Sequence, residues 1–217
     1  MKNSRKFFAV LLVYALVMVS GFSAFADSDI DTFPPVGIIS TALNNIGYNA
    51  RMNCSGESLN YNNRNVDLYH MIPGSSDQTW KVLPAENDRY YIASLTTDSG
   101  RNVYGLNIYR FSDNYGNCDV MKIRGNETDA SIRYHLVSGN LFTYDSICGL
   151  EQYYYPGYYA SVVRNGVGYY GCDVRWSNQG NPSNTSAMQW QLVHSGDYSN
   201  ESENSLNNLL TEMYHLS

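Results

Sequence analysis

The chain has 217 residues, with 20 acidic and 14 basic side chains and a formal net charge of −6. This length suits one domain of ordinary size. The negative charge argues against a nucleic-acid partner, because such binding depends on Lys and Arg side chains that neutralise phosphates. The four histidines are scattered and glycine-rich phosphate loops are missing, so we expect no cofactor.

The N-terminal residues have the pattern of an export signal. Three basic residues precede an apolar run over residues 7–19, and the small-residue pattern Ala24-Phe25-Ala26 follows. This order predicts a secretory signal peptide over residues 1–26 and, after it, a short leader over residues 27–35. The apolar run is too short for a comfortable membrane span. We therefore expect a secreted, extracellular protein that does not span a membrane.

Short strands of alternating polarity, separated by Gly, Asn, Asp and Ser turns, fill the chain after the leader. The same order of four strands occurs three times. First strands are predicted at 36–41, 90–95 and 141–146, and second strands at 48–53, 104–110 and 158–164. Third strands, each with Asp in second position, are predicted at 66–69, 118–121 and 172–175, and last strands at 78–83, 131–137 and 187–193. The repeats therefore extend over residues 36–84, 88–138 and 140–194.

Each repeat ends in an aromatic residue, which is Trp80, Tyr134 or Trp190. A four-strand unit of this size cannot bury its own apolar face, so three copies must share one core around an approximate threefold axis. This predicts an all-β fold, a β-trefoil over residues 36–194, with the three aromatic residues in the shared core. Residues 195–217 are predicted to form a polar linker and a short amphipathic C-terminal helix.

The repeat endings also carry a family resemblance. Gln78-Thr79-Trp80 has the form Gln-x-Trp, Met188-Gln189-Trp190 keeps the tryptophan, and Ile132-Arg133-Tyr134 keeps an aromatic residue. With their threefold repetition, these residues resemble the ricin-B-type β-trefoil lectin family over about residues 36–193. The resemblance implies a non-catalytic module that binds the carbohydrate of a glycan or glycoprotein.

The resemblance also implies where a sugar would bind. In the family, a sugar contacts a polar residue of the second strand, an aromatic residue of the third strand, and polar residues beside the Gln-x-Trp motif. In the first repeat these places fall on Asn49, Tyr69, Asp77 and Gln78, whose side chains suit paired hydroxyls and an apolar sugar face. The other two repeats lack the ring and the polar pair. The alternative is that these four residues brace a turn and a strand face.

The most tyrosine-rich stretch covers residues 153–159, with Tyr169-Tyr170 following it. A strand buries only alternate side chains, so about half of these rings must point outward. Exposed tyrosines suit recognition of glycans or proteins. We therefore propose from the sequence a second contact surface that consists of Tyr155, Tyr158, Tyr169 and Trp176. The alternative is a tyrosine-lined strand face without a ligand.

Asp67, Asp119 and Asp173 recur at one position of each repeat. Threefold-related side chains should lie on separate lobes, so they should not converge on one metal ion or one scissile bond. We expect a bracing role for them, no metal site and no enzymatic activity. A second hypothesis is a trefoil that binds a protein partner, either as a non-catalytic toxin subunit or as an inhibitor of an exported enzyme.

Four cysteines follow the predicted cleavage site: Cys54, Cys118, Cys148 and Cys172. An even count in an exported chain predicts two disulfide bonds. Three pairings are possible. Cys118 and Cys172 hold equivalent places in two repeats and are expected to lie beyond the roughly 7 Å that a disulfide bridges between Cα atoms. The repeat map favours Cys148 with Cys172 and Cys54 with Cys118.

Overall fold

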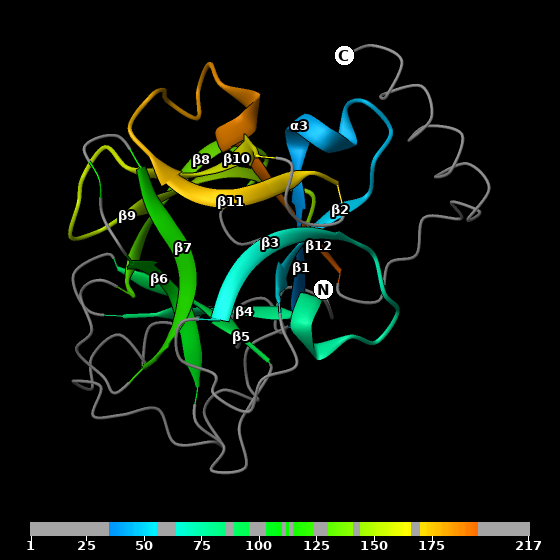
Figure 1. Ribbon diagram of the computed structural model, residues 1–217, viewed down its shortest axis with the longest axis horizontal. Coiled ribbons are helices and arrows are strands. Elements are labelled where there is room, and N and C mark those ends of the chain that lie inside the picture. The colour runs from blue at the N-terminus through cyan, green and yellow to red at the C-terminus, as the bar shows by residue number, and fades with distance from the viewer. Residues whose placement is uncertain are drawn as a thin grey trace, which may run out of the picture.

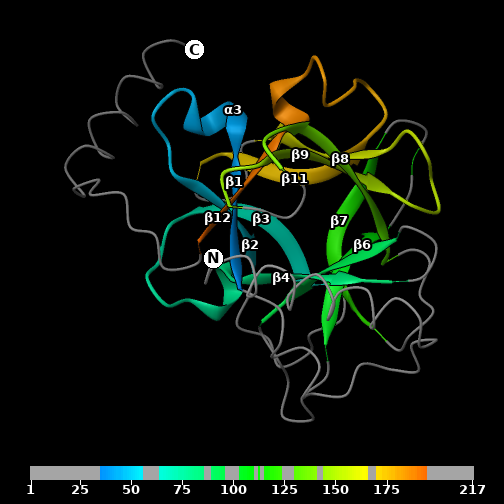
Figure 2. The ribbon, with the colours of Figure 1, turned by 180° about the vertical axis from the view of Figure 1, so that it is seen from behind.

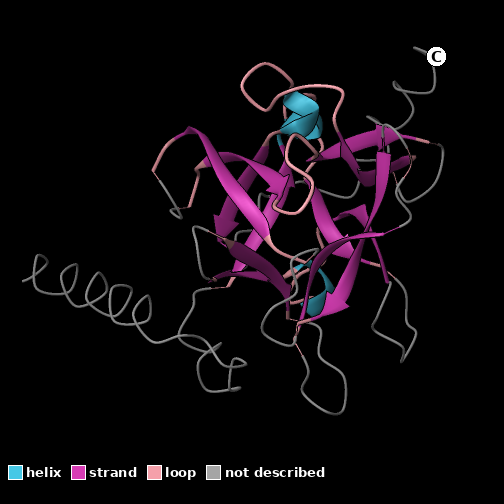
Figure 3. Ribbon diagram, turned by 90° about the vertical axis from the view of Figure 1, so that its left-hand side faces the viewer, coloured by secondary structure: helices cyan, strands magenta, loops and turns pink. Residues whose placement is uncertain are grey.

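A computed structural model of the chain describes residues 35–55, 64–85, 89–95, 103–109, 112, 115–123, 130–140, 144–165 and 170–194. The predicted signal peptide, the leader apart from Pro35, and the predicted linker and C-terminal helix lie outside these residues. The described part is built from strands, with short helical turns at both ends of the strand assembly (Figure 3). The all-β prediction is confirmed.

Twelve strands follow one another along the described chain (Figure 1). They are β1 (Val36–Ser40), β2 (Ala50–Cys54), β3 (Arg64–His70), β4 (Trp80–Pro84), β5 (Tyr90–Ser94), β6 (Tyr104–Tyr109), β7 (Tyr115–Lys122), β8 (Ile132–Ser138), β9 (Ile147–Gln152), β10 (Tyr159–Arg164), β11 (Cys172–Ser177) and β12 (Trp190–His194). The short helices are α3 (Thr41–Asn44), η1 (Ser76–Gln78) and η2 (Ser186–Met188). The Ser40 hydroxyl caps α3 by accepting a hydrogen bond from the Leu43 amide.

All strand pairs are antiparallel, and two sets of pairings organise them. Strands β1, β12, β9, β8, β5 and β4 pair in that order, and β4 pairs back to β1. Figure 2 shows β1 beside β12, where the first and last strands meet. The remaining strands form the hairpins β2–β3, β6–β7 and β10–β11. Strands β3, β7 and β11 pair with one another around a common centre (Figure 1).

One predicted strand is displaced. The first strand of the third repeat was expected at residues 141–146, but β9 begins at Ile147. Tyr144 and Asp145 lie in a turn, and Asp145 has a φ of 66°, which is the left-handed conformation that interrupts a strand. Residues 141–143 lie outside the described residues. The strand-like composition of this segment therefore belongs partly to the turn that leads into β9.

Three tryptophans occupy the core. Trp80, Trp176 and Trp190 are fully buried, and each indole N–H donates to a backbone carbonyl of a neighbouring hairpin. The acceptors are the carbonyls of Met52, Asn107 and Ala160, at 3.0, 2.9 and 2.9 Å respectively. The predicted core role of Trp80 and Trp190 is therefore confirmed. Trp176 is a correction, because a ring with no exposed surface cannot contribute to a contact surface.

Tyr134, the third of the repeat-ending aromatic residues, is less buried than Trp80 and Trp190. It is half-buried and packs against the core, and its hydroxyl lies 3.2 Å from Ser146 Oγ. Burial, reinforced by the neighbouring Cys148, raises the pKa of the Tyr134 phenol well above its ordinary value. The hydroxyl therefore stays protonated and available for hydrogen bonding at any physiological pH.

The predicted disulfides are absent. All four cysteines are free and buried. Cys54 lies on β2 and Cys118 on β7, and β3 runs between these strands. Two strand spacings of about 4.8 Å place their Cα atoms beyond the roughly 7 Å limit for a disulfide.

The second predicted disulfide fails for a similar reason. Strand β9, which carries Cys148, pairs with β10 through Glu151 and Tyr159, whereas Cys172 pairs with Arg164 at the other end of β10. Burial raises the pKa of the Cys54 and Cys148 thiols to about 12. These thiols are therefore packing groups with little thiolate character.

Candidate functional site

The four residues implied by the family resemblance lie around the end of the β2–β3 hairpin and the loop that follows it. Tyr69 is half-buried on β3 with its ring against the His70 ring, at a centroid distance of 4.4 Å. Asn49 is half-buried just before β2, and its amide lies 3.9 Å from Met71 Sδ. Asn49, just before β2, and Tyr69, on β3, therefore lie at the same end of the hairpin.

The Gln78 side chain is buried, whereas a residue that contacts a sugar must be accessible. Gln78 lies in η1 and is 2% exposed. Its Oε1 accepts from the Ile72 amide at 2.8 Å, and its Nε2 donates to the His70 carbonyl at 2.7 Å. Both ends of the amide are thus used to hold the loop after β3 against the strand, which favours the bracing alternative for this residue.

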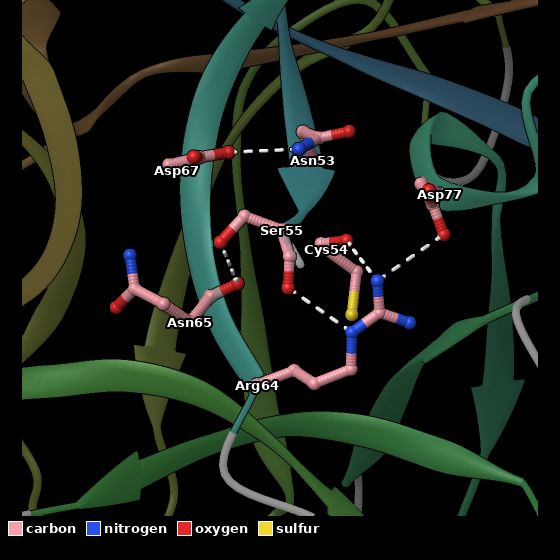
Figure 4. A network of polar contacts seen from close by, with 7 residues as sticks. All are labelled: Asn53, Cys54, Ser55, Arg64, Asn65, Asp67 and Asp77. Atoms are coloured by element: carbon pink, nitrogen blue, oxygen red, sulfur yellow. Dashed lines mark hydrogen bonds and ion pairs between the residues drawn. The ribbon is translucent and has the colours of Figure 1, made fainter. Parts of the chain in front are cut away.

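Asp77 faces a buried arginine at the opposite end of β3. Its Oδ1 lies 3.6 Å from Arg64 Nη2, and its side chain is 42% exposed. Arg64 also donates to the carbonyls of Cys54 and Ser55, both at 3.0 Å, and so ties the start of β3 to the end of β2 (Figure 4). Arg64 and Tyr69 are the first and sixth residues of β3, so the ion-pair partner of Asp77 is at the opposite end of the strand from Tyr69.

The three recurrent aspartates brace strands. Asp67 accepts from Asn53 at 2.9 Å (Figure 4), and Asp119 accepts from Asn107 at 2.8 Å. Asp173 accepts from Asn65 at 3.0 Å and from Asn165 at 3.2 Å. Each bond links two strands or a strand and its turn, because a carboxylate can accept several amide donors.

The expectation that the recurrent aspartates lie far apart is wrong for one pair. Asp67 and Asp173 are directly opposite each other in the β3–β11 pairing, because the three hairpins converge on a common centre. Within the described residues, no group of three or more His, Cys, Asp or Glu side chains is arranged to hold a metal ion. The close pair therefore contributes electrostatic repulsion inside the fold.

Because Asp67 lies opposite Asp173, the effect of Asp67→Asn on stability is predicted to depend on pH. Burial raises the pKa of Asp67, the charge of Asp173 raises it further, and the bond from Asn53 opposes the increase. A carboxyl group with a raised pKa in the folded state stabilises the protein below its unfolded pKa of about 4, and this stability is lost as the pH rises through the folded pKa. The amide introduced by the substitution would keep an acceptor for Asn53 without the charge.

We therefore expect Asp67→Asn to gain stability relative to the native protein as the pH rises from about 4 to 7. Urea unfolding midpoints at a series of pH values measure this difference. Asp145→Asn is the matched control, since it removes the same charge at an exposed turn. A stability difference that stays constant with pH, or that falls as the pH rises, would contradict the assignment.

The most exposed aromatic side chain of the described residues lies between β9 and β10. We call residues 153–158 the tyrosine turn. Tyr154 is 58% exposed, and its ring meets the edge of the Tyr155 ring at a centroid distance of 4.9 Å. Tyr155 in turn contacts Tyr158 edge to face, at 6.5 Å. Tyr155 and Tyr158 are half-buried and pack against the core, so Tyr154 lies against a ring that is itself held in place.

Two buried side chains of β9 hold the tyrosine turn in place. Gln152 is fully buried, and its Oε1 accepts from the Tyr154 amide at 2.8 Å. Glu151 is 6% exposed, and its Oε1 accepts from the amide of Gly157 at 2.7 Å. Gly157 has a φ of 88°, a conformation that glycine adopts at little cost. The turn is therefore pre-organised by the strand beneath it.

Charged residues surround Glu151 and the base of the turn. The Oε2 atom of Glu151 lies 2.8 Å from His135 Nε2 and 3.8 Å from Arg133 Nη1. The guanidinium groups of Arg133 and Arg89 lie 4.7 and 5.1 Å from the centroid of the Tyr153 ring. Burial, followed by the charge of Glu151, raises the pKa of the Tyr159 phenol.

The sequence identified this region but not its most exposed residue. Of the proposed second surface, Tyr155 and Tyr158 lie in the tyrosine turn, Trp176 is in the core, and Tyr169 lies outside the described residues. Tyr154 is the most exposed ring of the turn and was not singled out. In a run of tyrosines, the sequence does not reveal which rings are buried and which are exposed, so it could not distinguish Tyr154 from its neighbours.

No helix among the described residues is long and apolar enough to cross a membrane.

The sequence matches no protein-family profile and no curated protein. Solved structures are similar in three dimensions. The designed threefold-symmetric protein ThreeFoil is 16% identical, with 73% of this chain and 97% of that chain covered and a TM-score of 0.51. A Caenorhabditis elegans protein of unknown function is 11% identical, with 75% and 94% covered and a TM-score of 0.53. A mosquitocidal holotoxin is 12% identical, with 75% of this chain but 17% of the toxin covered, and a TM-score of 0.53. With the strand pairings above, these similarities establish a fold of the β-trefoil class.

Proposed function

We propose that this chain is a secreted, non-catalytic carbohydrate-binding module of the ricin-B-like type, built from three four-strand repeats. The repeats correspond to β1–β4, β5–β8 and β9–β12. The observation that carries the proposal is the tyrosine turn, where an exposed Tyr154 ring is supported by two other tyrosines and held by buried Glu151 and Gln152. A rigid, exposed ring is the platform that the apolar face of a sugar needs.

Rigidity matters because single sugars bind weakly. A shallow site of this kind is expected to have a dissociation constant near the millimolar range, which is about −4 kcal/mol. Ordering a loose loop on binding would consume much of that free energy. The two hydrogen bonds that Glu151 and Gln152 accept from the backbone of the turn remove that cost before the ligand arrives. Two χ angles per tyrosine keep the side-chain entropy loss small as well.

The first repeat supplies a second part of the proposal. Asn49 and Tyr69 lie at the same end of the β2–β3 hairpin, and they retain the amide and the ring that the family resemblance implies. Gln78 supports this place indirectly, since it fixes the loop that follows Tyr69 and His70. Tyr69 and Tyr154 are therefore the two residues whose replacement separates one candidate site from the other.

A glycan-array screen of the purified secreted protein tests the proposal. Tyr154→Ala is expected to weaken binding about fivefold to tenfold if the turn holds the sugar, because an aromatic contact contributes about 1 kcal/mol beyond the buried area. Tyr69→Ala is the parallel variant for the first repeat. Circular dichroism and thermal unfolding show that both variants are folded.

Each outcome has a definite meaning. Loss of binding in Tyr154→Ala assigns the sugar to the tyrosine turn, and loss in Tyr69→Ala assigns it to the first repeat. If the folded native protein binds no glycan on the array, the lectin proposal is wrong. The exposed Tyr154 ring would then favour the alternative, a trefoil that binds a protein partner through the same turn.

A further inference from the structure

The outer face of β8, next to the tyrosine turn, carries two basic side chains. Arg133 and His135 are two residues apart on this strand, so they point to the same face. Each has a side chain that is 42% exposed. They lie opposite Glu151 and Gly149 of β9, the strand that also holds the turn. The Arg133 guanidinium lies against the ring of Tyr153, the first residue of the tyrosine turn, so this face of β8 and β9 borders the turn.

The carboxylate of Glu151 is committed to the protein. One oxygen accepts from the Gly157 amide at 2.7 Å, and the other lies 2.8 Å from His135 Nε2. The side chain is 8% exposed, so little of the carboxylate faces the solvent. Glu151 therefore anchors the turn and orients His135, and it leaves little negative charge at the surface to repel an anion.

Arg133 is held in position but has hydrogen-bonding capacity to spare. Within the described residues, its polar contact is the 3.8 Å approach of Nη1 to Glu151, which is longer than a hydrogen bond. Its guanidinium carbon lies 4.7 Å from the centroid of the Tyr153 ring. A guanidinium that is oriented by an aromatic ring keeps its N–H edges free for a carboxylate or sulfate, which it binds with two parallel hydrogen bonds.

The surrounding charges favour a local anion site. Arg89 is 8% exposed and lies 5.1 Å from the centroid of the same Tyr153 ring, so it adds a second fixed positive charge. Arg133 and His135 thus lie beside the buried Glu151 carboxylate, and Arg89 and Arg133 both lie against the Tyr153 ring. The whole chain carries a net charge of −6, so a general attraction for polyanions is not expected. Recognition of an anion would therefore depend on the local positive charge of these side chains rather than on the charge of the whole protein.

We infer that the carbohydrate bound at the tyrosine turn carries an anionic group, either a carboxylate or a sulfate ester, and that Arg133 binds this group with His135 beside it. The inference rests on the proposed carbohydrate function and names the class of its ligand. The sugar face lies on Tyr154, and the anionic substituent reaches the exposed edge of Arg133.

The test is a glycan array that displays neutral, sialylated and sulfated glycans, probed with the native protein and three arginine variants. Arg133→Gln removes the positive charge, and Arg133→Lys keeps the charge but removes the planar fork. Arg164→Gln is the matched control, because it removes the same charge from an exposed position on β10. Thermal unfolding of each variant shows that it is folded.

We expect binding to be confined to the sialylated or sulfated glycans. Arg133→Gln should weaken that binding about tenfold to a hundredfold, the effect of losing a hydrogen-bonded charged partner. Arg133→Lys should fall in between, and Arg164→Gln should bind like the native protein. Affinity should also fall as the salt concentration rises. Whether the carboxylate or the sulfate arm of the array is bound identifies the anionic group.

Failure of the inference is distinct from failure of the proposed function. Binding of neutral glycans that depends on Tyr154 but not on Arg133 would overturn the inference and leave the lectin function standing. Equal weakening by Arg133→Gln and Arg164→Gln would reduce the effect to net charge and would also overturn it. If the folded native protein binds no glycan of any class, both proposals are wrong.

Discussion

Trp80→Ala is expected to lower the free energy of unfolding by about 3–5 kcal/mol, the range for large buried aromatic side chains. Trp80 has no exposed surface, and its indole N–H donates to the Met52 carbonyl at 3.0 Å. Alanine would leave both a cavity and a buried carbonyl without its donor. Urea unfolding monitored by far-ultraviolet circular dichroism measures the loss.

Two variants serve as controls for Trp80→Ala. Trp80→Phe keeps most of the apolar volume but not the donor, and should be less destabilising than alanine. Tyr154→Ala removes an aromatic ring that is 58% exposed, and its effect should stay within about 0.5 kcal/mol. Equal unfolding midpoints for Trp80→Ala and Tyr154→Ala would be incompatible with the core position of Trp80.

Gln78→Ala is expected to destabilise the protein by about 2–4 kcal/mol, because it leaves two backbone groups without partners. The Ile72 amide and the His70 carbonyl both bond to the Gln78 side chain, which is 2% exposed. Loss of these bonds should loosen the loop between β3 and η1. Urea unfolding gives the global change, and amide hydrogen exchange at Ile72 reports the local one.

Gln191→Ala is the matched control for Gln78→Ala. Gln191 is half-buried on β12, and its amide makes one long contact of 3.4 Å with Asp145. Its loss should change stability by no more than about 0.5 kcal/mol. If Gln78→Ala instead left both stability and exchange unchanged while abolishing sugar binding, Gln78 would be a ligand contact and the bracing role would be wrong.

Strand positions were largely predictable because runs of aromatic and β-branched residues bounded by Gly, Asn, Asp and Ser turns are typical of strands. Residues 90–95 and 104–110 were predicted as strands, and β5 and β6 occupy Tyr90–Ser94 and Tyr104–Tyr109. The segment at 141–146 was misplaced because its aromatic and β-branched residues favour a strand in isolation, and such β-propensity depends strongly on context. Nothing in the composition reveals that Asp145 takes a left-handed φ.

The candidate site was harder to predict because its properties arise from contacts between distant residues. Tyr154 and Trp176 are both aromatic residues near turns, yet one is 58% exposed and the other has no exposed surface. The difference follows from pairing, since Trp176 lies opposite Gly116 on β7 and Ala160 on β10. Similarly, the partnership of Arg133 and His135 with Glu151 depends on the β8–β9 register. A single sequence contains the residues but not that register.

The pairing of β1 with β12 has a consequence for how the chain folds. Val36 to Ser40 pair along their whole length with Trp190 to His194, whereas β1 pairs with β2 and β4 through one residue each. The first strand therefore lacks its main partner until the last strand has left the ribosome. Contacts so distant in sequence carry a large loop-closure entropy and slow the folding rate. During synthesis the edge of β1 that pairs with β12 has no partner. Folding of the described strands becomes cooperative only when β12 has paired with β1.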